Sequence, residues 1–232
     1  MSLPRRVVLL RHGRTAHNAT GRIQGQLDVS LDDVGRAQAL AVAEALAEAS
    51  PYAVVSSDLS RARDTGSAVA SRAGVSLLVD ERLREISLGA WQGLTSDEAA
   101  ARFPDEHAAW RRGEDVRRGG GETYYDAGVR AAECIRSLLA DLPDGRTLIA
   151  VTHGGTARGA LGVLLDLPVE GWWRLSPLGN TCWSVLVEAD LGWRLERHNT
   201  GLGPLIGAAT GAHDLGSRPV GGSSTSPDVE PR

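Results

Sequence analysis

Two histidines in the sequence each follow a short apolar run and precede a glycine. His12 ends the stretch "RVVLLRH" and His153 ends the stretch "TLIAVTH". Two arginines and a glutamate also come after short apolar runs. They are Arg11 beside the first histidine, Arg61 in "SSDLSRA" and Glu85 in "LREISLG". Imidazole, guanidinium and carboxyl groups together supply a nucleophile, an anion site and a proton donor. These five residues are therefore the first candidates for a reaction centre.

The charge types of these residues suit a phosphate group. Guanidinium groups pair bidentately with phosphate oxygens, and the N–H groups at helix N-termini also point at anions. A neutral imidazole in such a site can attack phosphorus and carry the phosphoryl group, while a backbone acceptor on its second ring nitrogen fixes the tautomer. The leaving oxygen then needs a proton. Glu85 would supply it if the charge of the phosphate outweighs the pull of the arginines toward the carboxylate form.

The elements that must position these residues alternate between strands and helices. Short apolar runs predict strands, and helical spacing of apolar residues predicts helices. The strands are expected over 6–10, 52–57, 75–80 and 147–153, and the helices over 30–49, 59–74, 122–141 and 156–166. Ser30 and Asp33 are spaced as a capping box for the first helix, and the residues between it and the first strand read as a loop. This alternation predicts an α/β fold with a mostly parallel sheet and helices on both faces.

Residues 182–199 differ from the rest, because they read as two strands joined at "ADLG", an antiparallel hairpin. The sheet is therefore mostly parallel with an antiparallel hairpin or edge. In a parallel sheet the residues at the C-terminal ends of the strands converge on one crevice, where ligands bind. We expect the five candidate residues to meet there, each delivered by the end of a strand and accompanied by two helix N-termini.

Segment 86–121 has short helical pieces and no strand pattern, and we expect it to cover one end of the sheet. Four of its five arginines lie close together, at positions 111, 112, 117 and 118. These arginines would bind a carboxylate or second anion of the substrate, or else form a solvated basic face.

Several other residues of this region have two interpretations each. Glu122 and Tyr124 could lie near the substrate, although Glu122 also suits the first turn of a helix. Trp91 and Trp110 would pack in the core or stack on a sugar ring. The stretch "WWRLSP" at 172–177, together with an exposed sheet edge, would pack either in the interface of a homodimer or in the core.

Composition removes several classes of protein. The chain has 232 residues and a net charge of -4, and all 25 of its basic residues are arginine. Without lysine it has no phosphate-binding loop of the GxxxxGK[ST] type, no Schiff-base lysine and no kinase signature. Its two cysteines, Cys134 and Cys182, predict buried thiols rather than a disulfide or a thiolate metal site. The acidic balance argues against a nucleic-acid surface.

The domain organisation and location follow from the distribution of residue types. Residues 1–199 are predicted to form one domain, and residues 200–232, rich in Gly, Ser and Pro, a flexible tail. No apolar run reaches the length of a membrane span, about 18 residues. The N-terminal stretch "MSLPRRVVLL" is too short for a secretory signal, and the charged residue Arg11 follows it directly. We therefore expect a cytoplasmic protein without a membrane partner.

The candidate residues stand in stretches that resemble a known family. "LLRHGRTAHN", "SSDLSRARDT", "LREISLGAWQG" and "VTHGG", in this order, are similar to the histidine phosphatase superfamily, the branch with phosphoglycerate mutases and many small-molecule phosphatases. The resemblance covers about residues 5–199. It implies a three-layer α/β/α sandwich and hydrolysis of a small phosphate ester through a phosphohistidine, with no metal and no other cofactor.

The resemblance also implies roles for single residues. His12 would be the phosphorylated nucleophile and Glu85 the proton donor, while Arg11, Arg61 and His153 would form the phosphate pocket. Further positions that the resemblance places against the phosphate or the substrate are Asn18, Gln24, Gly25 and Gly154.

The sequence departs from the family pattern at two positions. Arg14 stands where glutamate is commoner after "RHG", and His17 stands where an aromatic residue usually precedes Asn18. His17 would add a cation near the pocket or lie behind it or at the surface. Both departures bear on substrate preference rather than on the phosphate chemistry.

Three functions remain open at this point, and the residues favour one. Mutases of the family carry a longer segment between the acid and the second histidine, and a mutase needs a lid that keeps water from the phosphohistidine. The short segment between Glu85 and His153 therefore favours hydrolysis over mutase-type transfer. A non-catalytic binding protein would have lost His12 or Glu85. The stretches "RIQGQLDVSL", "WQGLT" and "GNTCW" resemble family members that hydrolyse glucosyl-3-phosphoglycerate.

Overall fold

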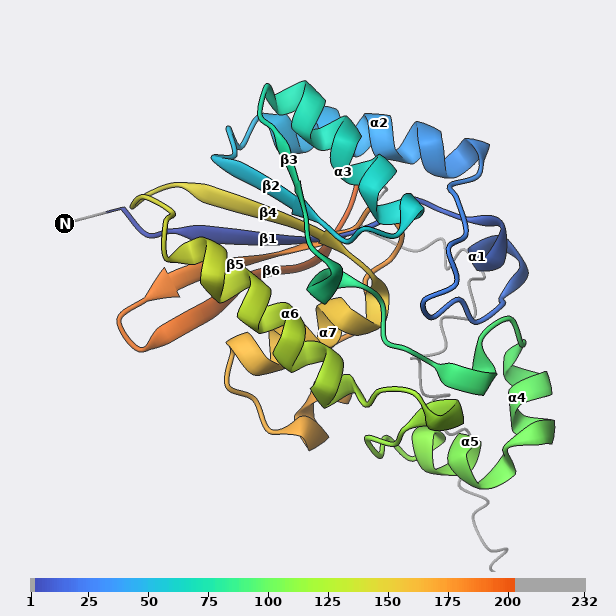
Figure 1. Cartoon of the computed structure of the whole chain (residues 1–232). Coiled ribbons are helices and arrows are strands. Elements are labelled where there is room, and N and C mark those ends of the chain that lie inside the picture. The colour runs from blue at the N-terminus through green and yellow to red at the C-terminus, as the bar shows by residue number, and fades with distance from the viewer. Residues whose placement is uncertain (1–2, 203–232) are drawn as a thin grey trace, which may run out of the picture.

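The computed structural model describes residues 3–202, and its elements follow the predicted alternation (Figure 1). The strands are β1 (Arg6–Arg11), β2 (Ala53–Ser56), β3 (Leu77–Val79), β4 (Thr147–Thr152), β5 (Trp183–Ala189) and β6 (Gly192–Thr200). The α-helices are α1 (Ala16–Thr20), α2 (Asp33–Ala47), α3 (Ser60–Ala73), α4 (Ser96–Arg102), α5 (Pro104–Arg111), α6 (Tyr124–Leu139) and α7 (Gly154–Leu164). Short 3-10 helices are η1 (Glu81–Leu83), η2 (Gly89–Trp91), η3 (Arg118–Gly120) and η4 (Val169–Arg174).

One six-stranded sheet has the order β3-β2-β4-β1-β5-β6. The pairs β1–β4, β2–β4 and β2–β3 are parallel, whereas β1–β5 and β5–β6 are antiparallel. The chain thus moves outward from β1 to β3 and then returns to insert β4 beside β1. Because crossovers between parallel strands are right-handed, this reversal places α2 and α3 on one face and α6 on the other, where α7 packs against α6 (Figure 1). The predicted three-layer α/β/α fold with an antiparallel edge is confirmed.

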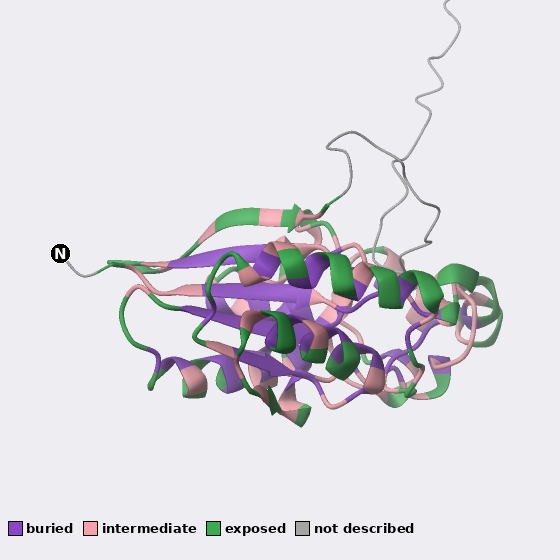
Figure 2. Ribbon diagram, turned by 90° about the horizontal axis from the view of Figure 1, so that it is seen from above, coloured by how far each residue is buried: buried purple, intermediate pink, exposed green. Residues whose placement is uncertain are grey.

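Strand β1 is buried on both faces, as its unbroken apolar run predicts. Val7 and Leu9 belong to the core against α6 and α7, and Val8 and Leu10 belong to the core against α2 and α3. Figure 2 shows the same pattern as buried strands between helices whose outer sides are exposed. The residues that follow β1 are therefore held by packing on both sides.

The first long helix begins later than its predicted capping box. Its N-cap is Asp32, whose side chain accepts a hydrogen bond of 2.7 Å from the Gly35 N–H. Ser30 does not cap it, because the next residue, Leu31, forms an antiparallel bridge with the loop after β1 and is extended. The predicted capping box of Ser30 and Asp33 is therefore wrong.

The stretch after β1, predicted as a loop, contains the five-residue helix α1. Thr15 and Asn18 form its capping box, and Gly21 closes it with a positive φ of 66°. Asparagine in place of the usual glutamate or glutamine hid this box in the sequence. The helix sets the direction in which the side chain of Asn18 points.

Segment 86–121 lies beyond the C-terminal ends of the parallel strands, as expected, and carries η2, α4, α5 and η3 (Figure 1). Trp91 and Trp110 are buried there with ring centroids 5.9 Å apart. Both pack in a core cluster, and neither lines the pocket of the candidate site. Trp172 of "WWRLSP" is also buried, and a Cβ on Gly162 would lie 2.1 Å from its ring.

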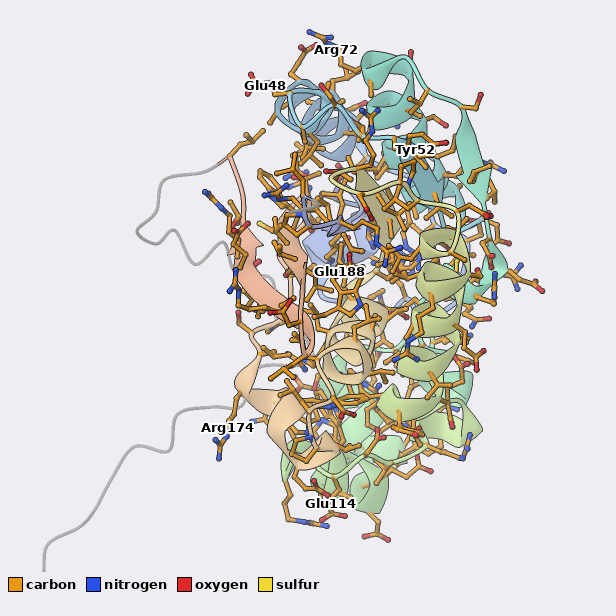
Figure 3. The ribbon with its side chains drawn as sticks, turned by 90° about the vertical axis from the view of Figure 1, so that its left-hand side faces the viewer. Glu48, Tyr52, Arg72, Glu114, Arg174 and Glu188 are labelled. Atoms are coloured by element: carbon orange, nitrogen blue, oxygen red, sulfur yellow. The ribbon has the colours of Figure 1, made fainter. Side chains whose placement is uncertain are left out.

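Figure 3 is a view onto the opposite end of the sheet, where Glu188 is labelled. There Arg5 forms an ion pair with Glu188 and donates a 2.7 Å hydrogen bond to the Leu139 carbonyl, which fastens β1 to β5 and α6. Of the two cysteines, Cys134 is buried and Cys182 is half-buried, and neither is in a disulfide. Within residues 3–202, no helix is long and apolar enough to cross a membrane. The predicted tail begins at Thr200, the last residue of β6, and from residue 203 onward lies outside the described part of the chain.

Candidate active site

The two predicted histidines meet because β1 and β4 are neighbours. In the parallel register Arg11 stands opposite Thr152, so the residues that follow, His12 and His153, leave the sheet side by side. Their ring centroids are 5.0 Å apart, and both side chains are buried. Two imidazoles from distant parts of the sequence thus share the edge of the sheet where the strand order reverses, the usual place for a ligand in such folds.

His12 is held in one tautomer. Its Nδ1 lies 2.7 Å from the Gly13 carbonyl oxygen, which can only accept, so Nδ1 carries the proton and Nε2 keeps its lone pair. Burial, and after it the charges of Arg61 and Arg11, hold the pKa of His12 well below its usual range. The ring is therefore neutral near pH 7 and can act as a nucleophile.

His153 has no hydrogen-bond partner for either ring nitrogen among the described residues. Burial lowers the pKa of His153 well below its usual range, and the charge of Arg61 adds to the effect. A buried polar group without a partner loses free energy that a ligand can restore. This imidazole therefore suits a ligand that brings its own donors or acceptors, as a phosphate does.

Two arginines supply the positive charge. Arg61, in the first turn of α3, is fully buried and donates to the carbonyls of Leu27, at 2.7 Å, and Gly25, at 2.8 Å. Burial lowers the pKa of Arg61 to about 10, which leaves it charged at neutral pH. Arg11 ends β1 and donates to the Leu178 carbonyl at 2.5 Å. A Cβ on Gly154 would lie 3.5 Å from Nη1 of Arg11, so this predicted site residue lies beside that guanidinium.

Glu85 reaches the site by a route that the sequence did not predict. It lies six residues after Val79, the end of β3, and β3 is an edge strand two places from β4. The intervening segment turns back across the sheet through η1, and the Thr152 hydroxyl donates 2.8 Å to the Leu83 carbonyl. The expectation that a strand end delivers Glu85 directly is therefore wrong, because an edge strand alone ends too far from β1.

The carboxylate of Glu85 occupies the N-terminus of α7. It accepts hydrogen bonds from the backbone N–H of Gly155 at 3.2 Å and of Thr156 at 2.9 Å. At the other predicted helix start, the Ser60 N–H donates 2.7 Å to Asp28. Carboxylates of the protein thus take the N–H groups of Ser60, Gly155 and Thr156, and the contribution of the two helix N-termini to the phosphate site stays a prediction.

Arg130 of α6 holds the backbone before Glu85. It donates to the carbonyls of Arg82 and Arg84, both at 2.7 Å, and of Glu85 at 3.0 Å. Its remaining donors bind the carboxylate of Glu122 at 2.8 Å. Glu122 is thus part of the support for the acid and does not line the pocket, whereas Tyr124 does.

The site contains a pocket with a cavity volume of about 100 Å³. Two predicted site residues do not line it: His153, which lies next to the His12 ring, and Gly154, which lies next to Arg11. That volume is below the roughly 300–1,000 Å³ of sites that enclose whole drug-sized ligands, so the pocket suits a small group such as a phosphate. Its lining includes the predicted residues Arg11, His12, Asn18, Gln24, Gly25, Arg61 and Glu85, and further His17, Gly21, Arg22, Ile23, Ile86, Leu88, Arg118, Tyr124 and Gly155.

The two amides of the site are oriented by the same residue. Oδ1 of Asn18 accepts from the Thr15 N–H at 3.2 Å, and Oε1 of Gln24 lies 3.0 Å from the Thr15 hydroxyl. With their oxygens held, both side chains have their NH₂ groups left to donate to an anion. Gly25 adopts a φ of 51°, and a Cβ there would lie 2.3 Å from the side chain of Gln92. Glycine is therefore required at this turn.

Of the two residues that depart from the family pattern, Arg14 lies away from the pocket and His17 lies in its wall. Arg14 forms an ion pair with Asp32, with Nε and Oδ2 2.8 Å apart, and does not line the pocket. His17 does line the pocket, and burial, with the charges of Arg22 and Arg61, lowers its pKa. A lowered pKa favours the neutral ring, so His17 contributes a hydrogen-bonding group and not a cation near pH 7.

Of the four arginines between 111 and 118, one lines the pocket. Arg118 is buried, whereas Arg112 and Arg117 are exposed and form ion pairs with Glu114 and Asp126. The four residues therefore do not act as one basic face. Of these four, only Arg118 lies where it could fulfil the predicted role of binding a carboxylate or second anion of the substrate.

Sequence reasoning missed three residues that shape the site. Thr65 accepts a 3.1 Å hydrogen bond from the Gly13 N–H, and the Asn180 amide donates 3.0 Å to the His12 carbonyl. Arg130 is the third. Each acts through a contact between segments distant in sequence, and no local pattern signals such a contact. In residues 3–202, no group of three or more His, Cys, Asp or Glu side chains could hold a metal ion. The absence of a metal from the reaction stays a prediction.

The sequence of this chain matches a known protein family. The model of the histidine phosphatase superfamily (branch 1) matches residues 7–201. The chain belongs to this superfamily. It is a phosphatase, and the resemblance of its motifs is confirmed.

Relatives of this histidine phosphatase share most of its length. Glucosyl-3-phosphoglycerate phosphatase of Mycolicibacterium vanbaalenii is 41% identical over 212 residues, 84% of this chain and 94% of the relative. A solved structure of mycobacterial glucosyl-3-phosphoglycerate phosphatase in complex with VO3 has a TM-score of 0.81 and 41% identity, covering 85% of this chain and all of that one. Metal-independent phosphoserine phosphatase of Arabidopsis thaliana is 38% identical over 66% of this chain and 65% of the relative.

Proposed function

We propose that this phosphatase hydrolyses glucosyl-3-phosphoglycerate, with His12 as the phosphorylated nucleophile and Glu85 as the proton donor. The observation that carries the assignment of roles is the arrangement around His12. Its Nδ1 is fixed by the Gly13 carbonyl, its pKa is lowered, and it shares a pocket with Arg11, Arg61 and Glu85. The neutral ring of this buried residue can attack, and the two guanidinium groups can neutralise the phosphate.

In the first step, Nε2 of His12 attacks phosphorus and the bond from phosphorus to the ester oxygen breaks. Arg11, Arg61 and His153 bind the non-bridging oxygens as their charge shifts in the transition state. The leaving oxygen takes the proton of the Glu85 carboxyl group, so that the alcohol departs neutral. The product of this step is phosphohistidine with Glu85 as carboxylate.

In the second step, Glu85 takes a proton from water, and the resulting hydroxide attacks phosphorus. The bond between phosphorus and Nε2 breaks, which returns the neutral imidazole and releases inorganic phosphate. The backbone N–H groups of Gly155 and Thr156 stabilise the Glu85 carboxylate formed between the steps. One carboxyl group thus serves as acid and then as base.

The substrate assignment rests on similarity and agrees with the size of the pocket. A relative with this activity shares 41% of its residues over 84% of the chain, and the stretches "RIQGQLDVSL" and "GNTCW" already resembled such enzymes. The cavity of about 100 Å³ takes the phosphate and leaves the glucosyl group at its mouth. We further propose a cytoplasmic location, with a small phosphate ester as ligand and neither nucleic acid nor membrane as partner.

The test is a panel of phosphate esters measured for release of inorganic phosphate. It contains glucosyl-3-phosphoglycerate, 3-phosphoglycerate, phosphoserine and glucose phosphates, each with wild type and with His12→Ala as the matched control. We expect the highest kcat/KM for glucosyl-3-phosphoglycerate and no turnover by the variant. A higher kcat/KM for another ester would reject the substrate, and isomerisation of phosphoglycerate stimulated by bisphosphoglycerate would instead support a mutase.

A further inference from the structure

Besides Arg11, Arg22 and Arg61, one further arginine lies in the wall of the same pocket. Arg118 of η3 lines the pocket and is 3% exposed. Among the described residues, its Nε and Nη2 have no hydrogen-bond partner, and no ion pair involves it. Its guanidinium carbon lies 4.6 Å from the centre of the Tyr124 ring and 5.9 Å from that of Trp110. Tyr124 also lines the pocket.

Arg158 of α7 adds a further buried charge behind Tyr124. It is 4% exposed, and its Nε and Nη2 also lack partners in the described part of the chain. Its guanidinium carbon lies 5.7 Å from the Tyr124 ring centre and 5.0 Å from that of Trp173. A Cβ on Gly159 would lie 2.6 Å from the Tyr124 carbonyl oxygen, so close packing of α7 on α6 keeps Arg158 beside this ring.

Buried charges without an anion are expensive. Transfer of a cation out of water is strongly unfavourable, and contact with an aromatic face offsets only part of that cost. Two such arginines around one aromatic ring therefore create a positive potential, and within residues 3–202 neither of them has an ion pair with a carboxylate. An anion of the ligand would neutralise it, and the residue that lines the pocket is the one placed to bind that anion.

The backbone at Arg118 is fixed independently of any ligand. The Gly119 N–H donates 2.6 Å to Glu106, and Gly119 has a φ of 57°. A Cβ on Gly89 would lie 1.9 Å from the Gly119 carbonyl oxygen, so η3 rests directly on η2, just after Glu85 in the chain. The glycine run after Arg118 thus sets this cation at a constant position relative to the acid of the site.

We propose that Arg118 binds the carboxylate of the substrate, with Tyr124 as its platform and Arg158 as a supporting charge. The two partnerless atoms, Nε and Nη2, form the edge of a guanidinium that pairs side-on with the two oxygens of a carboxylate. The inference rests on the proposed function, because glucosyl-3-phosphoglycerate carries one phosphate, which His12 attacks, and one carboxylate. Arg118 is therefore a specificity-determining residue, distinct from the residues that bind the phosphate.

The test compares two small esters that differ at one group. 3-Phosphoglycerate carries a carboxylate where glycerol 3-phosphate carries an alcohol. Their inhibition constants against hydrolysis of an aryl phosphate are measured for wild type, Arg118→Gln, Arg118→Lys and the matched control Arg117→Gln. Arg117 is the neighbouring residue with the same charge, but it is exposed and paired with Asp126. The ratio of the two constants does not depend on the folded fraction of a preparation.

We expect wild type to bind 3-phosphoglycerate more tightly, and Arg118→Gln to reduce this preference about 10- to 100-fold, the loss typical of a hydrogen-bonded charge. Arg118→Lys should retain part of the preference, and Arg117→Gln should leave it unchanged. The proposal is overturned if wild type has no preference, if Arg118→Gln retains it, or if Arg117→Gln reduces it equally. Failure of wild type to hydrolyse glucosyl-3-phosphoglycerate would reject the proposed function alone, since the inhibition assay does not require that activity.

Discussion

Arg130 is the residue whose replacement should separate support of the acid from the chemistry itself. Its guanidinium donates to the carbonyls of residues 82, 84 and 85, in the backbone that carries Glu85, and to both oxygens of Glu122. Burial raises the pKa of Glu122, but its hydrogen bonds with Arg130 and Ser87 outweigh burial and hold the pKa below its ordinary value. Arg130→Met keeps most of the side-chain length and removes every one of these donors.

The expected loss of stability depends on which acceptors lose their last hydrogen-bond donor when Arg130 is replaced. The carbonyls of residues 84 and 85 each keep a second donor, and Glu122 keeps the Ser87 N–H, whereas the Arg82 carbonyl has no other hydrogen bond among those of the described residues. Breaking a fully buried pair costs about 3–5 kcal/mol, and Arg130 and Glu122 are 19% and 25% exposed. We therefore expect Arg130→Met to lower the free energy of unfolding by about 3 kcal/mol.

The same change should also reduce turnover. A displacement of about 1 Å in a catalytic group can cost a hundredfold, so we expect kcat to fall roughly 10- to 100-fold while KM changes little. Urea unfolding and steady-state kinetics measure the two effects, and Arg136→Met, an exposed arginine on the same helix, is the control. A loss below about 1 kcal/mol with unchanged kcat would refute the reasoning, as would an equal effect of the control.

Two further predictions concern pH and metal. Burial lowers the pKa of His12 and His153 in the folded chain, so below their ordinary pKa of 6.5 the unfolded chain binds more protons. The free energy of unfolding should therefore fall as the pH falls from 6.5, by about 1.4 kcal/mol per pH unit for each histidine, and His153→Gln should remove one such contribution. Urea unfolding at pH 6.5 and 5.5 measures the slope, and an equal slope in both proteins would contradict the assignment. Hydrolysis of an aryl phosphate should persist in excess chelator, because Arg11 and Arg61 supply the positive charge at the phosphate; activity that disappears with chelator and returns with a metal would refute this.

The elements around the site could be predicted because their signals are local. The run "RVVLL" is apolar at every position from Val7 to Leu10, as a strand buried on both faces requires, and the change to Arg11 and His12 marks where it leaves the sheet. The placement of His12 next to His153 could not be predicted from local sequence signals. It depends on insertion of β4 beside β1, a pairing between residues far apart in the sequence.

Glu85 and Arg118 show what local patterns do not contain. The route of Glu85 depends on the edge position of β3 and on hydrogen bonds from Arg130 and Thr152. Arg117 and Arg118 are adjacent and chemically identical, yet one is exposed and the other lines the pocket. The backbone after Arg118 packs closely on Gly89, a contact that exists only in the folded chain.

The central claim is that the phosphoryl group passes through His12, and trapping of the intermediate tests it most directly. The enzyme is mixed with a phosphate ester, quenched in alkali within the first turnover and digested, and the phosphorylated peptide is identified by mass spectrometry. Phosphohistidine is stable in base and labile in acid, so the label should be found on His12 and disappear on acidification. Glu85→Gln should retain it with a good leaving group. Phosphate on any other residue, or turnover by His12→Ala at a rate near that of wild type, would contradict the account.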